Sequence, residues 1–358
     1  MQLFFLNLWQ IRLALEINFF RLGTDSGDSG CYFRDMTSPE DAELVLVSAP
    51  WGVTSASGEG SAYAPDAIID SSAHIAEFDA SSGFSFGGKI ATAPIDYDIQ
   101  ENSQRLGADA EKVISHVEDG GVLAGEYFSR KVARINEGFV QMHESIRTQT
   151  AHWLAAGKKV GIIGGDHTVG FGAIEAVAAH EGEIGVLYID AFCDMHLPSE
   201  SLFEYSHLSA ARNIMEEIPS VGCMVQVGVR DVGSDEYAHT GADNRIALFL
   251  MDDLVSRHFG GESWSAICDT IIARLPHKVY VSVDVAALSL DCFPHSKQPV
   301  AGGLSFNETV FLINRLAASG REIVGFDMTG IVPKFENNID AVAGARLLAK
   351  LCCAVLKK

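Results

Sequence analysis

Apolar residues of this chain gather in short continuous runs that recur along most of its length. Seven runs have the length of a strand, at 44–47, 160–163, 184–189, 224–227, 246–250, 279–283 and 323–326. Continuous rather than alternating apolar residues are typical of strands that are buried on both faces. Helical spacing of apolar residues lies between them, most clearly at 140–156, 173–179, 307–318 and 341–355. The alternation of strand and helix predicts a three-layer α/β/α fold with a mostly parallel central sheet.

Two parts of the chain depart from this rhythm. Between 81 and 138 a Gly/Ser-rich turn, a possible strand and a charged helix-like segment follow one another, without a composition break that would mark a domain boundary. The apolar start is interrupted by Gln10, Arg12, Glu16 and Asn18, too early for a membrane span. We therefore expect an N-terminal extension over 1–40, amphipathic or packed on a neighbouring subunit, and one α/β domain over 41–358.

The charge and cysteine content of the chain limit the ligands and the cell compartment that we expect. Lys and Arg number 26 against 47 Asp and Glu, which gives a net charge of −21. Nucleic acid and anionic lipid surfaces would be repelled, whereas a hard divalent cation could be bound by a cluster of these carboxylates. The 7 cysteines are odd in number and scattered, with no C-x-x-C pair. This distribution predicts a reducing compartment, and hence the cytoplasm.

The candidate chemistry follows three of the predicted strands. In an open α/β sheet, ligands bind at the carboxyl ends of strands. Gly164 and Gly165 lead from one strand into Asp166 and His167, where they form either an anion cradle at a helix start or merely a tight turn.

The other two strands end in acidic residues. One is followed by Asp190, Asp194 and His196 at even spacing, and another ends at Asp284. Each aspartate alone could be a helix cap or a structural acceptor, but three strand ends that carry Asp and His favour a metal or catalytic site.

These motifs, in this order and spacing, resemble the signatures of the arginase, agmatinase and formiminoglutamase family, the ureohydrolases. The segments 65–68 and 301–305, the strand end at Phe326 and Asp327, and the terminal helix at 341–351 also resemble that family. The resemblance extends from about residue 44 to the C-terminus and implies the arginase-like fold. It further implies a trimeric or hexameric homo-oligomer and a small guanidino or formimino compound as substrate.

In this family two Mn²⁺ ions hold a water that hydrolyses a C–N bond of a linear amidine. The resemblance implies that His167, Asp190, Asp194 and Asp284 are the ligands of one ion, and all four residue types are present. It also implies that His207 lies near the leaving group and moves a proton, so His207 and Asp194 are the candidate catalytic residues. A surface loop is the alternative position for His207.

The same comparison exposes departures where the second ion and the substrate would bind. Phe192 and Ala286 stand where the family has a His and an Asp ligand, and neither can coordinate a metal. Ser289 replaces a further acid, and Gly330 replaces the Glu that holds the cationic group of the substrate. His196 or Cys193 could be recruited instead if their loop bends.

Three hypotheses follow. The first is a hydrolase of guanidino or formimino compounds that works with one Mn²⁺ ion rather than two. The second is a catalytically inactive member of the family with a binding, regulatory or structural role in an oligomer. The third, a nucleotide-binding protein built around 164–167, lacks a phosphate-binding Lys.

Overall fold

The computed structural model describes residues 33, 37–54, 58–197, 201–295, 298–334 and 337–357. Most of the predicted N-terminal extension, residues 1–40, lies outside the described residues. From residue 33 onward the described chain forms one compact unit.

The central sheet has eight strands, and each of its pairings is parallel. Its order is β4-β1-β5-β10-β9-β6-β7-β8. The strands are β1 (Leu44–Ala49), β4 (Ile90–Thr92), β5 (Lys159–Gly164), β6 (Ile184–Ile189), β7 (Val221–Val229), β8 (Ile246–Leu250), β9 (Lys278–Asp284) and β10 (Glu322–Thr329). All seven apolar runs therefore form strands, and the predicted parallel sheet is confirmed. A small antiparallel pair, β2 (Phe78–Asp79) with β3 (Phe84–Ser85), lies outside this sheet.

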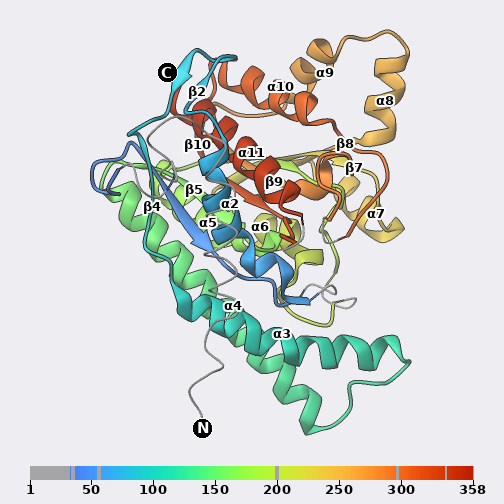
Figure 1. Cartoon of the computed structure of the whole chain (residues 1–358). Helices are drawn as coiled ribbons and strands as arrows, with labels where there is room; N and C mark the ends of the chain where they lie inside the picture. Colours follow the sequence, from blue (N-terminus) through green and yellow to red (C-terminus); the bar gives the residue numbers. More distant parts are fainter. Residues whose placement is uncertain are drawn as a thin grey trace. The chain divides into compact units, whose positions relative to one another are not determined.

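Helices cover both faces of the sheet, which gives the three layers (Figure 1). Successive strand residues point to opposite faces, so Leu44 and Leu46 of β1 join one hydrophobic cluster while Val45 and Val47 join the other. The first face is covered by α2 (Ala64–Ser71), α8 (Met251–Phe259), α9 (Trp264–Ile272), α10 (Phe306–Ala317) and α11 (Ile339–Leu356). The second is covered by α3 (Tyr97–Glu118), α4 (Glu126–Ala155), α5 (Gly170–Glu181) and α6 (Ala210–Glu217).

The irregular region of the sequence contains the longest helices. α3 and α4 pack against each other as a hairpin, visible at the bottom of Figure 1. Asp96 begins α3 as its N-cap, because its carboxylate accepts the amide of Asp98 at 3.1 Å. α4 begins at Glu126, well before the helical run predicted from residue 140, because the exposed charged residues of its first half conceal the apolar spacing.

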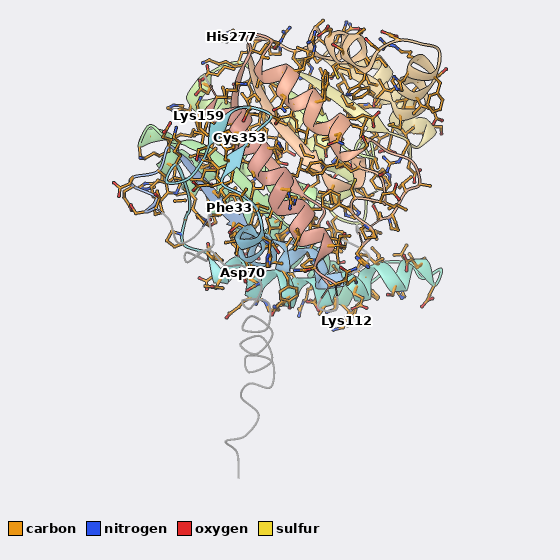
Figure 2. The ribbon with its side chains drawn as sticks, turned by 45° about the horizontal axis from the view of Figure 1, so that its top comes forward. Phe33, Asp70, Lys112, Lys159, His277 and Cys353 are labelled. Carbon is orange, nitrogen blue, oxygen red and sulfur yellow. The ribbon has the colours of Figure 1, made fainter. Side chains whose placement is uncertain are left out.

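The predicted site residues lie at one end of the parallel strands. Lys159 begins β5 and His277 directly precedes β9, so these two residues, labelled in Figure 2, lie at the amino ends of the strands. The predicted site residues lie at or after the carboxyl ends of strands, and therefore at the opposite end of the sheet. Among the described helices, none has the length and apolar character that crossing a membrane requires.

Candidate metal centre

The order of the strands brings the predicted site residues together. β5, β10, β9 and β6 are consecutive neighbours in the sheet. His167, Gly330 and Asp190 follow β5, β10 and β6, and Asp284 is the last residue of β9. Residues as far apart in sequence as His167 and Ser282 thus come within hydrogen-bond distance.

Three of the four predicted ligands form a close group. His167 Nδ1 lies 2.6 Å from Asp190 Oδ2 and 3.5 Å from Asp194 Oδ2. One ligand atom from each residue lies within 4.8 Å of the others, and all three side chains are buried. Two carboxylates and an imidazole converging in this way are suited to bind a divalent cation.

The orientation of His167 is fixed from behind by a chain of hydrogen bonds. Ser282 Oγ donates its proton to Asp327 Oδ1 at 2.8 Å, so His167 Nε2, 2.8 Å from Ser282 Oγ, must be the donor in its own bond. Nδ1 is therefore the nitrogen that faces Asp190 and Asp194. A metal-binding histidine is commonly held through its other nitrogen in this manner.

Tyr188 supports the same group from β6. Its ring stacks on that of His167, with centroids 4.2 Å apart, and its hydroxyl donates to Asp194 Oδ2 at 2.6 Å. Tyr188 and Asp190 point to the same side because they are two residues apart at the end of a strand.

Asp284 lines the same cavity, but its carboxylate is bonded elsewhere. Oδ1 accepts the amide of Ala286 at 2.8 Å, and Oδ2 accepts the hydroxyl of Thr329 at 3.0 Å. Asp284 is therefore outside the close group of three. Its assignment as the fourth ligand stays a prediction.

The absence of a side chain at Gly330 leaves room for the carboxylate of Asp284. Gly330 has φ +84°, and a Cβ at this position would lie 2.1 Å from Asp284 Oδ1. The Glu that the family resemblance implies here has no room while Asp284 keeps this position.

The electrostatics of the group favour a cation. Burial, followed by repulsion from Asp284 and Asp194, raises the pKa of Asp190 above its ordinary value. Burial alone would lower the pKa of His167, but its hydrogen bonds to Asp190 and Asp194 raise that pKa well above its ordinary value. Burial also raises the pKa of Asp327, to about 6. The cluster therefore has a strong affinity for positive charge, which a proton or a metal ion can supply.

A small cavity of about 30 Å³ opens onto this cluster. Its lining consists of Asp166, His167, Asp190, Phe192, Asp194, His207, Asp284, Ala286, Gln298 and Gly330. Phe192 and Ala286 present a phenyl ring and a methyl group, which offer no donor atom to a metal. The residues present thus fit one ion, and they do not fit a second ion between Phe192 and Ala286.

His207 lines the cavity from η5 (His207–Ser209), a short 3₁₀ turn, and its catalytic role stays a prediction. Thr54, on the loop after β1, positions it. The hydroxyl oxygen of Thr54 accepts the amide of His207 at 3.2 Å and lies 3.3 Å from Nδ1. This hydroxyl can also donate its own proton to Nδ1, and in that arrangement the ring proton of His207 lies on Nε2.

The two proposed substitute ligands are engaged elsewhere. His196 Nε2 lies 3.7 Å from Glu236 Oε2, and Cys193 Sγ lies 3.3 Å from both Gln226 Oε1 and Thr240 Oγ1. Burial raises the pKa of Cys193 to about 12, which disfavours the thiolate. Neither residue belongs to the close metal-binding group among the described residues.

The glycine pair before His167 serves close packing. A Cβ on Gly165 would lie 1.6 Å from the carbonyl oxygen of Trp51, and the amide of Asp166 donates to that same oxygen at 2.8 Å. Asp166 then caps η4 (His167–Val169) by accepting the amide of Thr168. The tight-turn interpretation accounts for these contacts.

Reasoning from the sequence did not identify Thr54 or Tyr188 as site residues. The position of Tyr188, two residues before Asp190, was a usable signal. Thr54 had none, because 153 residues separate it from His207.

The fold and this cluster define an α/β protein with a buried carboxylate–histidine cluster, a candidate metal centre, at the carboxyl ends of its central strands. The family model described as "Arginase family" matches residues 42–354. The chain therefore belongs to the arginase family.

Curated relatives resemble the chain over most of its length. N(1)-aminopropylagmatine ureohydrolase of Thermus thermophilus is 26% identical over 313 residues, which cover 87% of this chain and 90% of the relative. The enzyme of the same name from Thermococcus kodakarensis is 25% identical over 318 residues, which cover 87% and 91%. Agmatinase of Proteus mirabilis is 26% identical over 221 residues, which cover 58% and 63%.

Solved structures agree on the fold. Proclavaminate amidino hydrolase from Streptomyces clavuligerus superposes with a TM-score of 0.66 at 20% identity, covering 91% of this chain and 99% of that one. Formimidoylglutamase from Bacillus subtilis gives 0.65 at 17% identity, covering 96% and 99%. The arginase-like architecture predicted from the sequence is confirmed.

Proposed function

We propose that this protein hydrolyses a C–N bond of a linear amidine, a guanidino or formimino compound, with the help of one divalent ion, Mn²⁺. The close group of His167, Asp190 and Asp194 at the base of a cavity that also contains His207 is the observation that carries the proposal. The names of two relatives, ureohydrolase and agmatinase, support the guanidino class. We expect a trimer or hexamer in the cytoplasm, as the family resemblance implies.

One ion is the stoichiometry that the ligand set favours. His167, Asp190 and Asp194 would hold it, and Asp284 would join them by turning from Thr329. When bound, the ion supplies Lewis acidity to a hydrolytic reaction. The imidazole and carboxylates suit Mn²⁺ and similar divalent ions, so ligand type alone does not select Mn²⁺ among them.

His207 is the proposed proton donor. His207 lines the cavity beside the ligand cluster, and when the Thr54 hydroxyl donates to Nδ1 the ring proton lies on Nε2. When water adds to the amidine carbon and the C–N bond breaks, the leaving nitrogen needs a proton. His207 would donate it, and the proton released by the attacking water would restore the imidazole.

A second candidate is a binding or regulatory role without catalysis. Phe192 and Ala286 remove the donors for a second ion, and Gly330 removes the carboxylate that would hold a cationic group. A charge-assisted contact of that kind contributes roughly 2 kcal/mol in a site shielded from water. These losses all affect the reaction chemistry and leave the fold intact.

Product release separates the two candidates. Purified protein would be incubated with Mn²⁺ and a panel of guanidino and formimino compounds, and urea and formamide would be measured. We expect release from at least one compound, and its loss in Asp194→Asn and His207→Ala. If the protein retains Mn²⁺ but releases neither product from any compound, the binding role replaces the hydrolase proposal.

A further inference from the structure

Asp194 adopts an unusual backbone conformation. Its φ is +52°, a positive value that no other non-glycine residue in the described part of the chain has. Such a conformation is uncommon for residues with a side chain, and it persists only where the surroundings enforce it. The segment around Asp194 must therefore be held by specific contacts.

The contacts come from two helices. On one side, α6 supplies Arg212, whose amide donates to the carbonyl oxygen of Asp194 at 3.1 Å and whose guanidinium donates to the carbonyl oxygen of His196. On the other side, α7 (Ser234–Ala242) supplies Glu236, whose Oε1 accepts the amide of Met195 at 3.0 Å.

The carboxylate of Glu236 binds two backbone segments, the one after Asp194 and the start of α7. While Oε1 binds Met195, Oε2 accepts the amide of Gly233 at 2.9 Å at the start of α7, and it also lies 3.7 Å from His196 Nε2. The side chain is 9% exposed. A buried carboxylate is costly unless its oxygens are satisfied, and here both oxygens accept a backbone amide.

From this geometry we infer that Glu236 is a positioning residue for the metal centre. By binding the amide that directly follows Asp194, Glu236 holds Asp194 in the strained conformation in which its carboxylate meets His167 and Asp190. It also keeps the ring of His196 beside α7. Glu236 belongs neither to the ligand cluster nor to the cavity lining, so its effect passes through the backbone of Asp194 and Met195. The inference rests on the proposed metal site.

Helix α10 offers a matched control. Glu308 occupies the same capping position there, and its Oε2 accepts the amide of Ser305 at 2.8 Å. Glu308→Ala therefore removes a helix cap of the same kind without touching the 190–196 segment. Glu236→Gln is the milder variant at the test position, because its single amide oxygen can replace only one of the two acceptors.

Two measurements test the inference. In metal-free protein, hydrogen exchange of the 190–196 amides should be faster in Glu236→Ala than in the parent and unchanged in Glu308→Ala. Mn²⁺ affinity would be measured in titrations followed by electron paramagnetic resonance. Glu236→Ala should bind Mn²⁺ at least about 10-fold more weakly than the parent, because residues that support metal ligands commonly contribute 10- to 100-fold to affinity. Glu236→Gln should be intermediate, and Glu308→Ala should match the parent.

The outcomes are distinguishable. Unchanged exchange at 190–196 in both Glu236 variants would overturn the positioning role, whether or not the protein binds Mn²⁺. Faster exchange with undiminished Mn²⁺ affinity would overturn the link to the metal centre. If the parent protein binds no Mn²⁺, the proposed function is contradicted. In that case the hydrogen-exchange data alone decide whether Glu236 positions the 190–196 segment.

Discussion

Uncharged residues control the geometry of the charged ones at this site. Thr54 orients His207, Ser282 relays the bond from His167 to Asp327, and Gly330 leaves the space in which Asp284 rests. Each acts through a single hydroxyl or through the absence of a Cβ. Substitutions at these positions therefore test the site without altering its charge.

Thr54→Val should slow the proposed reaction while leaving Mn²⁺ binding unchanged. Valine keeps the shape of threonine but neither accepts the amide of His207 nor bonds to Nδ1, so the imidazole loses both contacts that orient it. A positioned general acid contributes roughly 100- to 10,000-fold, and we expect kcat to fall at least about 10-fold, with the pH dependence of kcat altered. Thr54→Ser should restore most of the rate. Equal kcat values for Thr54→Val and the parent would contradict this role.

Gly330→Ala should destabilise the protein more than a positive φ alone explains. An added Cβ would lie 2.1 Å from Asp284 Oδ1 and displace a buried carboxylate. Gly320 is the control, since its φ is +81° and a Cβ there meets nothing within 4 Å. In urea unfolding we expect Gly330→Ala to cost at least about 1 kcal/mol more than Gly320→Ala, the order of cost for overpacking. Equal losses of unfolding free energy in the two variants would show that the carboxylate of Asp284 moves away from the added Cβ without cost.

At the scale of elements, the α3–α4 hairpin depends on one buried acid. Asp109 of α3 is 8% exposed and binds Lys131 of α4, with Arg134 Nη1 at 3.3 Å and Lys112 Nζ at 3.8 Å. The hydrogen bond to Lys131 lowers the pKa of Asp109 from its ordinary value of 3.8. A lowered pKa stabilises the folded state above the ordinary value, and this contribution is lost as pH falls through the folded-state value.

Asp109→Asn should therefore lower the free energy of unfolding at pH 7, by about 1–3 kcal/mol, because Lys131 loses its charged partner. The difference between the variant and the parent should shrink below pH 3.8, where Asp109 becomes protonated in the unfolded chain. Chemical unfolding at pH 7 and at pH 3 would measure both values. A difference that is the same at both pH values would contradict the electrostatic origin.

The elements of the fold were largely predictable from the sequence, and the reason is physical. Strands such as β6 are buried on both faces, so their residues are almost uniformly apolar and easy to recognise. α4 was predicted too short because its first half is mostly exposed and carries little apolar spacing.

The site was predictable only where its residues follow strand ends. His167, Asp190 and Asp194 were found in this way, and the structure brings them together. Packing between distant segments determines the other features, and a sequence pattern does not contain it. These features are the bond of Asp284 to Thr329, the positive φ of Asp194 and the contact of Thr54 with His207.

At the scale of the whole molecule, the sheet order joins these local features into one centre. Within four neighbouring strands, β5, β9 and β6 bring the predicted ligand residues to one end of the sheet, while α6 and α7 hold the segment that carries Asp194. The net charge of −21 adds a general attraction for cations. Only the buried cluster, however, provides converging ligands among the described residues.

The number of Mn²⁺ ions bound per chain tests this account most directly. Protein freed of metal, dialysed to equilibrium against micromolar Mn²⁺ and assayed by elemental mass spectrometry should contain one ion per chain. Asp194→Asn should contain less. Two tightly bound ions per chain would contradict the claim that Phe192 and Ala286 exclude the second ion, and a chain that retains none would contradict the metal centre itself.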